Sequence, residues 1–537
     1  MALLLTDIKM PIETQWSEMP ALISAQFDLP AQSVQATRII RESLDARKKH
    51  DVHFRISAVV QLESIWQNRL VKRGDKRVSV YVPPAEYSLP TGTEQPKGRI
   101  VVVGFGPAGI FAAYFLAQAG YTPLVLERGR EVAQRKADVL RFWGNGTLDE
   151  QSNVMFGEGG AGTFSDGKLT TRSKDVRADV VLATLAKHGA PDDIVYQAKP
   201  HVGTDLLQNV VRNMREAISN MGGEIRFESR MCDLHVQDGE LVAVDVMHNG
   251  KKEHIACAAC VLAAGQAARD VYELLLHKGL TLVPKSFAVG VRIEHPQGMI
   301  DRAQFGALAG HPRLGAAEYR LTAQSGSRGV YTFCMCPGGQ VVASSSAEEQ
   351  VVVNGMSDRA RNGKNANAAV IVQVGPDDFG HDPLSGVRFQ QELERKAYLL
   401  GTLDGAYHAP AQRLEDFLAF RQSRAFGDVK PSYRPGVSMH KLDALLPEYV
   451  CTGIRDGIAG FARQLKGFDL PDAVLTAVES RTSAPVRILR DERGEAPGAS
   501  GLYPVGEGVG YAGGIVSAAI DGMHAAERIA AKFKPQL

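Results

Sequence analysis

The stretch that decides the fold runs from residue 99 to residue 109 and reads Arg-Ile-Val-Val-Val-Gly-Phe-Gly-Pro-Ala-Gly. The β-branched run over 99–103 is typical of a buried parallel strand. Glycines follow at once with GxGxxG spacing, and residues 110–119 have the composition of a helix that Gly120 ends. The sequence therefore predicts a strand, a tight turn and a helix in direct succession.

Each residue of this turn has a physical role. Gly104 permits the tight turn, Gly106 lacks a Cβ and lets a pyrophosphate approach the backbone, and Gly109 lets the helix pack closely on the strand. Pro107 and Ala108 lie at the helix N-terminus, whose free N–H groups and positive dipole end attract phosphate. We therefore expect a dinucleotide here; the alternative is a glycine-rich turn without a ligand.

A second strand, expected over 121–126, ends in an acid that supports this interpretation. Glu127 follows it directly, and its carboxylate is placed to accept hydrogen bonds from a ribose. The same carboxylate disfavours the 2′-phosphate of NADP, although the neighbouring Arg128 weakens that exclusion slightly. The glycine motif is thus accompanied by the two strands, the helix and the acid that a dinucleotide site requires.

A second glycine cluster, near the C-terminus, favours FAD over NAD. A short apolar strand ends at Gly506 and Glu507, and a helix then opens at Gly513, Gly514 and Ile515. FAD is long, and its flavin half needs contacts from a distant part of the chain. Glu507 would accept ribityl hydroxyl hydrogen bonds, while the helix directs its positive end at the flavin N1–C2=O edge, which becomes anionic on reduction. We therefore expect FAD as the cofactor.

With these motifs the sequence resembles the flavoproteins of the glutathione-reductase class, and within them a bacterial family of uncharacterised FAD-dependent dehydrogenases. In that class a strand ending in Ala-Thr-Gly and a later Gly-Asp follow the fingerprint; here Ala264-Gly265 and Gly506-Glu507 stand in these places, with Ala for Thr and Glu for Asp. The resemblance implies non-covalent FAD, a helix over 203–221, a strand at 225–228 and a β-meander. It also implies that the backbone near Met231 lies beside the adenine.

Residues 157–169, Gly-Glu-Gly-Gly-Ala-Gly-Thr-Phe-Ser-Asp-Gly-Lys-Leu, are a further glycine-rich segment. Glycines permit close backbone approach to a ligand. We expect this segment to contact the cofactor, with Gly162, Ser165 and Lys168 as its contributing residues; the alternative is a flexible surface loop. No residue is assigned a catalytic role at this point. Arg481 would neutralise an anionic substrate or the reduced flavin, or else form a structural ion pair.

Six cysteines in 537 residues are too few for a disulfide framework. Cys257 and Cys260 have Cys-x-x-Cys spacing, but no paired ligands nearby complete a zinc site, so no metal is expected. Cys334 and Cys336, two apart on an expected strand, are awkward to bridge and are interpreted as ordinary buried cysteines. The absence of cysteine between 105 and 231 excludes a disulfide reductase of the Cys-x4-Cys kind.

Composition makes several partners improbable. Lys+Arg total 61 against 60 Asp+Glu, so there is no global field to attract nucleic acid or an anionic membrane. The apolar run at the N-terminus ends at Asp7 and is too short for a signal peptide. We therefore expect a cytoplasmic protein. A second strand–GxGxxG–helix unit is missing from the sequence, so NAD(P)H would bind only transiently. Oligomeric state stays open.

The predicted fold is α/β, with a discontinuous Rossmann-like FAD-binding domain over 97–290 and 461–537 that includes the β-meander. An α+β cap or substrate domain over 291–460 is inserted in it. A small α+β module over 1–96 precedes it: residues 33–49 have helical spacing, while 52–60 and 78–82 alternate like strands. Prolines between 83 and 96 form a linker.

The expected function is an FAD-dependent oxidoreductase that binds a small molecule between the FAD and cap domains. Two alternatives stay open. One is an FAD-dependent RNA-modifying protein whose N-terminal module contacts RNA, and the other is a non-catalytic flavin-binding sensor or scaffold. Salt-sensitive RNA binding through residues 1–96 would indicate the first. A flavin that no donor reduces would indicate the second.

Overall fold

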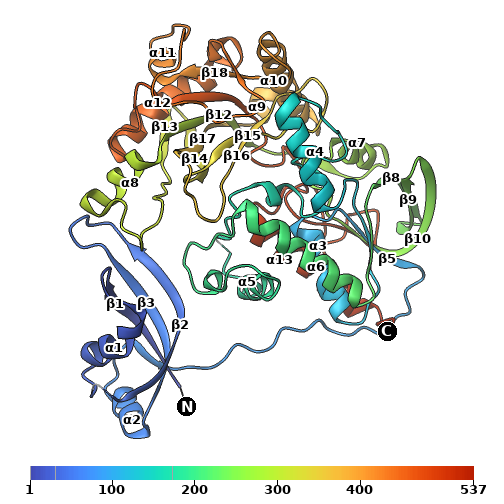
Figure 1. Ribbon diagram of the computed structural model, residues 1–537. Coiled ribbons are helices and arrows are strands. Elements are labelled where there is room, and N and C mark those ends of the chain that lie inside the picture. The colour runs from blue at the N-terminus through green and yellow to red at the C-terminus, as the bar shows by residue number, and fades with distance from the viewer. Residues whose placement is uncertain (1, 31, 172) are drawn as a thin grey trace.

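The computed structural model describes residues 2–30, 32–171 and 173–537. A small N-terminal module lies at one side, a central body holds a parallel sheet, and an upper body, called the cap below, is built around a second large sheet (Figure 1). An extended segment joins the module to the central body. The expected mixed α/β fold with several sheets is confirmed.

The central sheet has five parallel strands in the order β7-β6-β5-β10-β22. They are β5 (Arg99–Val103), β6 (Leu124–Leu126), β7 (Glu224–Arg226), β10 (Lys251–Leu262) and β22 (Leu502–Pro504). The last strand comes from near the C-terminus, and its Leu502 lies opposite Cys260 of β10. Segments far apart in the sequence therefore form one sheet. Strand β6 is shorter than the predicted 121–126.

The fingerprint helix α3 (Pro107–Gln118) packs against α13 (Ile515–Lys532) and α6 (Thr204–Asn220) (Figure 1). This close packing of helices explains why two positions are occupied by glycine. A Cβ on Gly109 would lie 2.0 Å from the carbonyl oxygen of Gly104, and one on Gly522 would lie 2.0 Å from that of Ala108. Further helices of this body are α4 (Val132–Asn145), α5 (Arg177–Lys187) and α7 (Arg269–His277).

The expected β-meander is present. Strands β8 (Ser229–Gln237) and β9 (Glu240–His248) pair antiparallel with each other, and β9 pairs with the first half of β10. The second half of β10 turns into the parallel sheet beside β5. A short pair, β11 (Leu282–Pro284) and β21 (Val486–Ile488), links the central body to the chain entering and leaving the cap.

The cap is a seven-stranded sheet in the order β13-β14-β17-β12-β20-β18-β19. Its strands are β12 (Phe287–Pro296), β13 (Thr322–Ser325), β14 (Arg328–Cys336), β17 (Asn365–Val374), β18 (Ala409–Arg413), β19 (Val437–Met439) and β20 (Val474–Glu479). The small pair β15 (Gln340–Ala343) and β16 (Val353–Met356) adds to it. The helices are α8 (Gln297–Phe305), α9 (Pro376–Phe379), α10 (Ser385–Gly401), α11 (Leu414–Leu418) and α12 (Glu448–Gln464).

The boundaries expected at 290/291 and 460/461 fall inside β12 and α12. The sheet itself gives the reason: β20 pairs antiparallel with β12, so the first strand of the cap is completed only by a strand that comes after 470. Helix α12 covers the sheet formed by these strands, against β13, β14 and β17. The cap therefore extends beyond both predicted ends.

The N-terminal module has the order β2-β3-β1-β4, all antiparallel. Its elements are β1 (Leu3–Pro11), α1 (Met19–Phe27), β2 (Val34–Asp45), β3 (His53–Leu62), α2 (Ser64–Lys72) and β4 (Val78–Val80). The helix predicted over 33–49 is wrong, because this segment is strand β2. It pairs with β3 from Val34 to Asp45, and this pairing outweighs the local helical spacing.

The linker after the module is packed rather than free. Tyr87 stacks edge-on against Phe115 of α3 at 4.9 Å, and its hydroxyl donates to Glu527 of α13 at 2.8 Å. Among the residues that the structure describes, none of the helices is long and apolar enough to cross a membrane.

Candidate functional site

A cavity of about 1270 Å³ lies between the central body and the cap. Every site residue predicted from the sequence lines it except Gly109, which in the described chain serves helix packing instead. The lining residues predicted are Gly104, Gly106, Pro107, Ala108, Glu127, Arg128, Gly162, Ser165, Lys168, Met231, Ala264, Gly265, Gly506, Glu507, Gly513, Gly514 and Ile515. The two glycine clusters thus meet at one cavity.

At the fingerprint end, Glu127 has a second role that the sequence does not reveal. It is only 5% exposed, and its carboxylate accepts hydrogen bonds from the backbone N–H groups of Phe105 at 2.8 Å and of Gly129 and Gly157 at 2.9 Å. One side chain therefore fastens three loops around the cavity. Glu127 also lines the cavity.

The glycine-rich segment 157–169 lies directly against the fingerprint turn. The N–H of Gly159 donates to the carbonyl of Phe105 at 2.8 Å, and a Cβ on Gly160 would lie 2.9 Å from the Cα of Gly106. Both backbones border the cavity here. A side chain on Gly160 would therefore press on the fingerprint turn at the border of the cavity.

The polar side chains of this segment are largely occupied by protein partners. Ser165 Oγ donates to the carbonyl of Gly162 at 2.7 Å and accepts from the N–H of Gly167 at 3.0 Å. Lys168 Nζ donates to the carbonyl of Met335 in the cap, and Asp166 pairs with Arg361. The segment thereby joins the cap to the central body, while its backbone lines the cavity.

Two further predicted residues lie on the wall near the fingerprint. Arg128 Nη2 is 2.9 Å from Asp270 Oδ1, and its guanidinium stacks 4.4 Å above the ring of Phe156. Met231 is only 4% exposed and pairs with Val246 in the meander. Arg128 is therefore held in place at the wall of the cavity by an ion pair and a ring contact.

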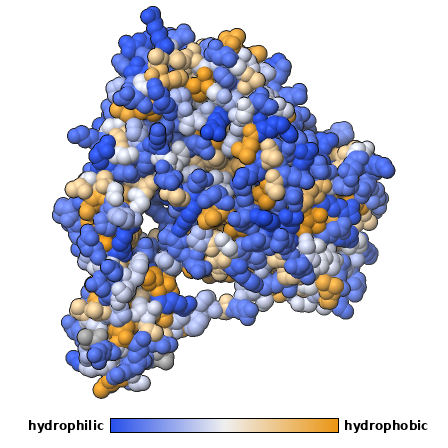
Figure 2. Space-filling view, viewed as in Figure 1, coloured by the Kyte–Doolittle hydropathy of each residue, from blue (hydrophilic) through white to orange (hydrophobic). Residues whose placement is uncertain are grey.

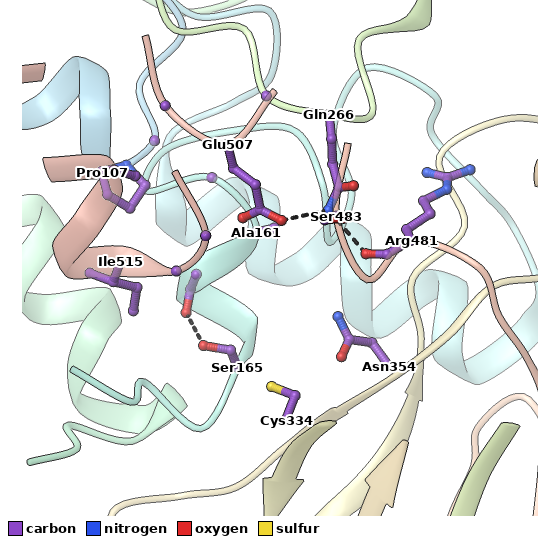
Figure 3. A pocket seen from close by; sticks show the side chains of 18 of the residues that line it. Pro107, Ala161, Ser165, Gln266, Cys334, Asn354, Arg481, Ser483, Glu507 and Ile515 are labelled. Atoms are coloured by element: carbon purple, nitrogen blue, oxygen red, sulfur yellow. Dashed lines mark hydrogen bonds between the residues drawn. The ribbon is translucent and has the colours of Figure 1, made fainter. Parts of the chain in front are cut away.

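The C-terminal cluster leaves open space and lies near the fingerprint turn, since a Cβ on Gly162 would lie 3.2 Å from Ile515 Cγ1 and 3.8 Å from Pro107 Cγ. Ideal Cβ atoms on Gly265, Gly513 and Gly514 would meet none of the described atoms within 4 Å. Helix α13 begins just after Gly514, so its first turn points its free N–H groups toward the cavity (Figure 3). The glycines before α13 and the start of that helix therefore border open space in the cavity.

Glu507 is linked to neighbours that the sequence did not indicate. Gln266 Nε2 donates to Glu507 Oε1 at 3.0 Å and to the carbonyl of Arg481 at 3.0 Å (Figure 3). Burial raises the pKa of Glu507 to about 7, and the backbone N–H of Gly514 opposes that shift. The side chain therefore holds or releases a proton close to neutral pH.

The cap contributes residues that sequence reasoning missed. Cys334, Asn354 and Ser483 line the cavity, and Figure 3 shows Cys334 and Asn354 across the open space from Glu507. Cys334 is half-buried, so the expectation of an ordinary buried cysteine is wrong for it, whereas Cys336 is buried as expected. A bulge in β14 is the reason: pairing with β17 shifts between Phe333 and Cys336. No local sequence signal marks this bulge.

Arg481 forms a structural ion pair, one of the two roles considered for it. Its Nη2 is 2.8 Å from Glu394 Oε2, and Nη1 donates to Ser346 Oγ at 2.6 Å. Glu394 is also paired with Arg269 at 2.9 Å. Because Glu394 is shared by Arg481 and Arg269, one carboxylate faces two guanidinium groups, and the cluster keeps a net positive charge where Arg481 borders the cavity.

Two family models match parts of the chain. Residues 286–482 match the family model described as "FAD-dependent protein, C-terminal domain-like", and residues 3–61 match a domain of unknown function. The first match confirms FAD as the cofactor and coincides with the cap. An uncharacterized protein from Clostridium beijerinckii is 47% identical over 538 residues, which is 99% of each chain.

Three solved structures resemble the chain at low identity and low TM-score. Glycine oxidase from Geobacillus kaustophilus matches 82% of this chain and 96% of its own, at 10% identity and a TM-score of 0.35. A geranylgeranyl bacteriochlorophyll reductase-like protein from Thermoplasma acidophilum matches 82% of this chain and 79% of its own, at 14% identity and a TM-score of 0.33. A mutant of the halogenase PltM in complex with FAD matches 82% of this chain and 72% of its own, at 11% identity and a TM-score of 0.39.

Proposed function

The chain belongs to the same family as the Clostridium beijerinckii protein, and we propose that it is an FAD-dependent oxidoreductase whose small-molecule substrate binds between the FAD site and the cap. The single observation that carries the proposal is the shared cavity: the fingerprint turn, the segment 157–169 and the C-terminal glycines all line it. Cap residues complete its opposite wall, where a substrate would meet the flavin.

The residues proposed to hold FAD follow the length of the cavity. The turn at Gly106 and the N-terminus of α3 would bind the pyrophosphate, Glu127 the adenosine ribose, and the backbone at Met231 the adenine. Glu507 would bind ribityl hydroxyls, and the start of α13 would face the flavin ring. When bound, FAD supplies the redox chemistry, while the chain orients it and sets the charges around it.

Two finer proposals accompany this assignment. The central body corresponds to the discontinuous FAD domain of the glutathione-reductase class, which is supported by β22 joining the parallel sheet and by the meander. Any NAD(P)H would bind transiently from the cap side, because the described residues form one fingerprint turn of this kind, between β5 and α3. Substrate access is proposed along the edge formed by Lys199, Gln304 and Arg320, which line the cavity.

Anaerobic reduction tests the proposal. Purified protein with its bound flavin is mixed with a panel of donors, including NADH, NADPH and candidate small-molecule substrates, and the flavin absorbance is followed. Rapid bleaching by at least one donor, with catalytic turnover when an acceptor is added, is the expected result. A flavin that dithionite reduces but that every physiological donor leaves oxidised would instead indicate the sensor or scaffold alternative.

A further inference from the structure

Asn354, in the cap strand β16, directs its amide nitrogen into the cavity. Figure 3 shows this nitrogen pointing into the open space across from Glu507, on the same side of that space as Cys334. The side chain accepts hydrogen bonds through Oδ1, whereas Nδ2 has no hydrogen-bond partner among the residues that the structure describes. The nitrogen therefore carries two N–H donors that are available to a bound molecule.

The neighbours of this amide fix its orientation. Asn354 Oδ1 accepts hydrogen bonds from Arg292 Nη2 and from the backbone N–H of Gly355, both at 2.8 Å. Both neighbouring groups are donors only, so a flipped amide would place N–H groups against N–H groups. The oxygen must therefore face Arg292, and the nitrogen must face the cavity.

Arg292 is itself held in one position. Its guanidinium is fully buried, and Nε and Nη2 donate to the two carboxylate oxygens of Glu479 at 2.8 and 3.3 Å. Nη1 donates to the carbonyl of Cys334 at 2.8 Å and to Asn367 Oδ1 at 3.0 Å. With the bond to Asn354, each of the five N–H groups of the guanidinium has an acceptor. The amide of Asn354 is therefore anchored to a rigid part of the cap.

A positive charge lies next to this amide. Lys168 lines the cavity, and its Nζ donates to the carbonyl of Met335, the residue that follows Cys334. An ammonium group has three N–H donors, so this bond leaves two of them for other partners. Lys168 and Asn354 thus lie on either side of Cys334, and these three residues are called the cap wall below.

The acids near the cap wall are already paired with other cations. Asp166, two residues before Lys168, accepts from Arg361 Nε at 2.9 Å. Glu318, a further acid that lines the cavity, has its Oε1 2.6 Å from Lys199 Nζ. In the described chain no carboxylate forms an ion pair with Lys168. Its charge is therefore not neutralised, and it favours an anionic group in the cavity.

We propose that the substrate carries a carboxylate and that the cap wall binds it, with Asn354 Nδ2 and Lys168 Nζ donating to its oxygens. A carboxylate only accepts hydrogen bonds, so it matches an amide N–H₂ group beside an ammonium group. One unpaired positive charge also matches the single negative charge of a carboxylate better than the larger charge of a phosphate. The inference rests on the proposed function, because it names the class of substrate that would meet the flavin at this wall.

Calorimetric titration of the full-length, FAD-loaded protein at constant ionic strength tests the inference without relying on turnover. The probes are acetate and benzoate, their neutral amides acetamide and benzamide, and inorganic phosphate. At least one acid is expected to bind about tenfold more tightly than its own amide. Equal affinities for each acid and its amide, tighter binding of phosphate than of both acids, or no binding of either acid at about 50 mM overturns the inference.

Two variants test whether the acid binds at the cap wall. Asn354→Asp keeps an acceptor for Arg292 and for the N–H of Gly355, so the cap should fold, but it replaces the cavity-facing donors by negative charge. Binding of the acid is expected to weaken at least about tenfold, and binding of its amide, which has N–H donors of its own, is expected to weaken less. Lys168→Gln is expected to reduce the preference for acid over amide to about twofold or less.

Asn362→Asp is the matched control. It makes the same chemical change at an exposed position of the cap that does not line the cavity. Because a charge in solvent is screened, the affinity for the acid should stay within about twofold of the unmodified protein. An unchanged affinity in Asn354→Asp, or an equal loss in the control, overturns the inference.

The same titrations on FAD-free protein separate this inference from the proposed function, since calorimetry detects the acids whether or not flavin is bound. A protein that holds FAD but binds acids no better than amides overturns this inference alone. A protein that never binds FAD, yet binds benzoate or acetate in a manner that depends on Asn354, contradicts only the proposed function.

Discussion

Gly106 and Gly160 lie against each other at the phosphate end of the cavity, one from the fingerprint turn and one from the segment 157–169. A Cβ on Gly160 would approach the Cα of Gly106 to 2.9 Å, and Gly160 itself has a φ of 61°. The contact brings together two turns that are some fifty residues apart in the sequence. A side chain on Gly160 forces the two backbones apart, whereas a Cβ on Gly106 would lie 3.7 Å from the Cα of Gly160, which is an ordinary contact. Both residues border the cavity.

We predict that Gly160→Ala weakens FAD binding at least tenfold and lowers the free energy of unfolding by about 1–3 kcal/mol. The matched control is Gly250→Ala in the β9–β10 turn, whose φ is 73° and whose Cβ would meet none of the described atoms within 4 Å. That variant carries the backbone strain alone. Fluorescence titration with FAD and urea denaturation measure the two quantities, and equal effects from both variants would contradict the account.

Glu127 offers a second test, because its carboxylate fastens three loops. Glu127→Gln replaces one acceptor oxygen by an N–H₂ group that faces a backbone donor, so the stability is expected to fall by about 1–3 kcal/mol and FAD affinity with it. Glu240→Gln, at an exposed position on β9, is the control and should stay within about 0.5 kcal/mol of the unmodified protein. Retention of both stability and affinity in Glu127→Gln would show that these hydrogen bonds are unimportant.

Glu507→Ala is expected to lower FAD occupancy in purified protein, since ribityl hydroxyls lose an acceptor and Gln266 loses its partner. The effect should amount to about 1–3 kcal/mol of binding free energy. Flavin released by heat is quantified against protein concentration. Unchanged flavin content would remove Glu507 from the proposed FAD contacts.

The same residue predicts a pH dependence. Burial raises the pKa of Glu507 to about 7 from the ordinary 4.5, so the folded chain keeps a proton that the unfolded chain has already lost within this window. The free energy of unfolding of FAD-free protein should therefore fall as pH rises from 4.5 to 7. Glu507→Gln cannot ionise and should gain about 1–3 kcal/mol relative to the unmodified protein across that window. Parallel pH profiles for the two proteins would contradict the shift.

Arg313 holds the N-terminal module against the cap. Its Nη1 donates to the carbonyl of Ile12 at 2.7 Å, and its guanidinium lies 5.1 Å from the ring of Trp16 and 4.8 Å from that of Phe54. Arg313→Ala should make the linker over 83–96 several times more sensitive to proteinase K. Flavin content should stay unchanged, because the described residues that line the cavity all lie after 102.

The control for this change is Arg302→Ala, at an exposed position in the last turn of α8. In this variant the linker over 83–96 should be as resistant to proteinase K as in the unmodified protein. If loss of Arg313 also removes the flavin, the module has a role in the FAD site that its position does not indicate.

The sequence predicted the parts of the site that depend on local backbone geometry. Glycine spacing at 104–109 and 506–514 specifies turns whose backbone must approach a ligand, and these turns indeed share one cavity. Gly109 was assigned correctly as a packing residue yet grouped with the ligand contacts. Local rules suffice here because a turn is made by neighbours in the chain.

What the sequence could not provide depends on contacts between distant segments. Cys334 reaches the cavity only because of a bulge between paired strands, and Gln266 meets Glu507 only when β10 and the C-terminal segment converge. Strand β2 was mistaken for a helix because its partner β3 decides its conformation. Arg292 and Glu294, both fully buried in the mostly apolar strand β12, were available sequence signals of charged networks in the cap.

A crystal structure of the protein with FAD tests the central claim most directly. Electron density for one FAD per chain is expected to run through the cavity, with the pyrophosphate at Gly106 and Gly160 and the isoalloxazine between Gly514 and Cys334. FAD bound elsewhere on the molecule, or a cavity that stays free of density when crystals grow with excess FAD, would contradict the account.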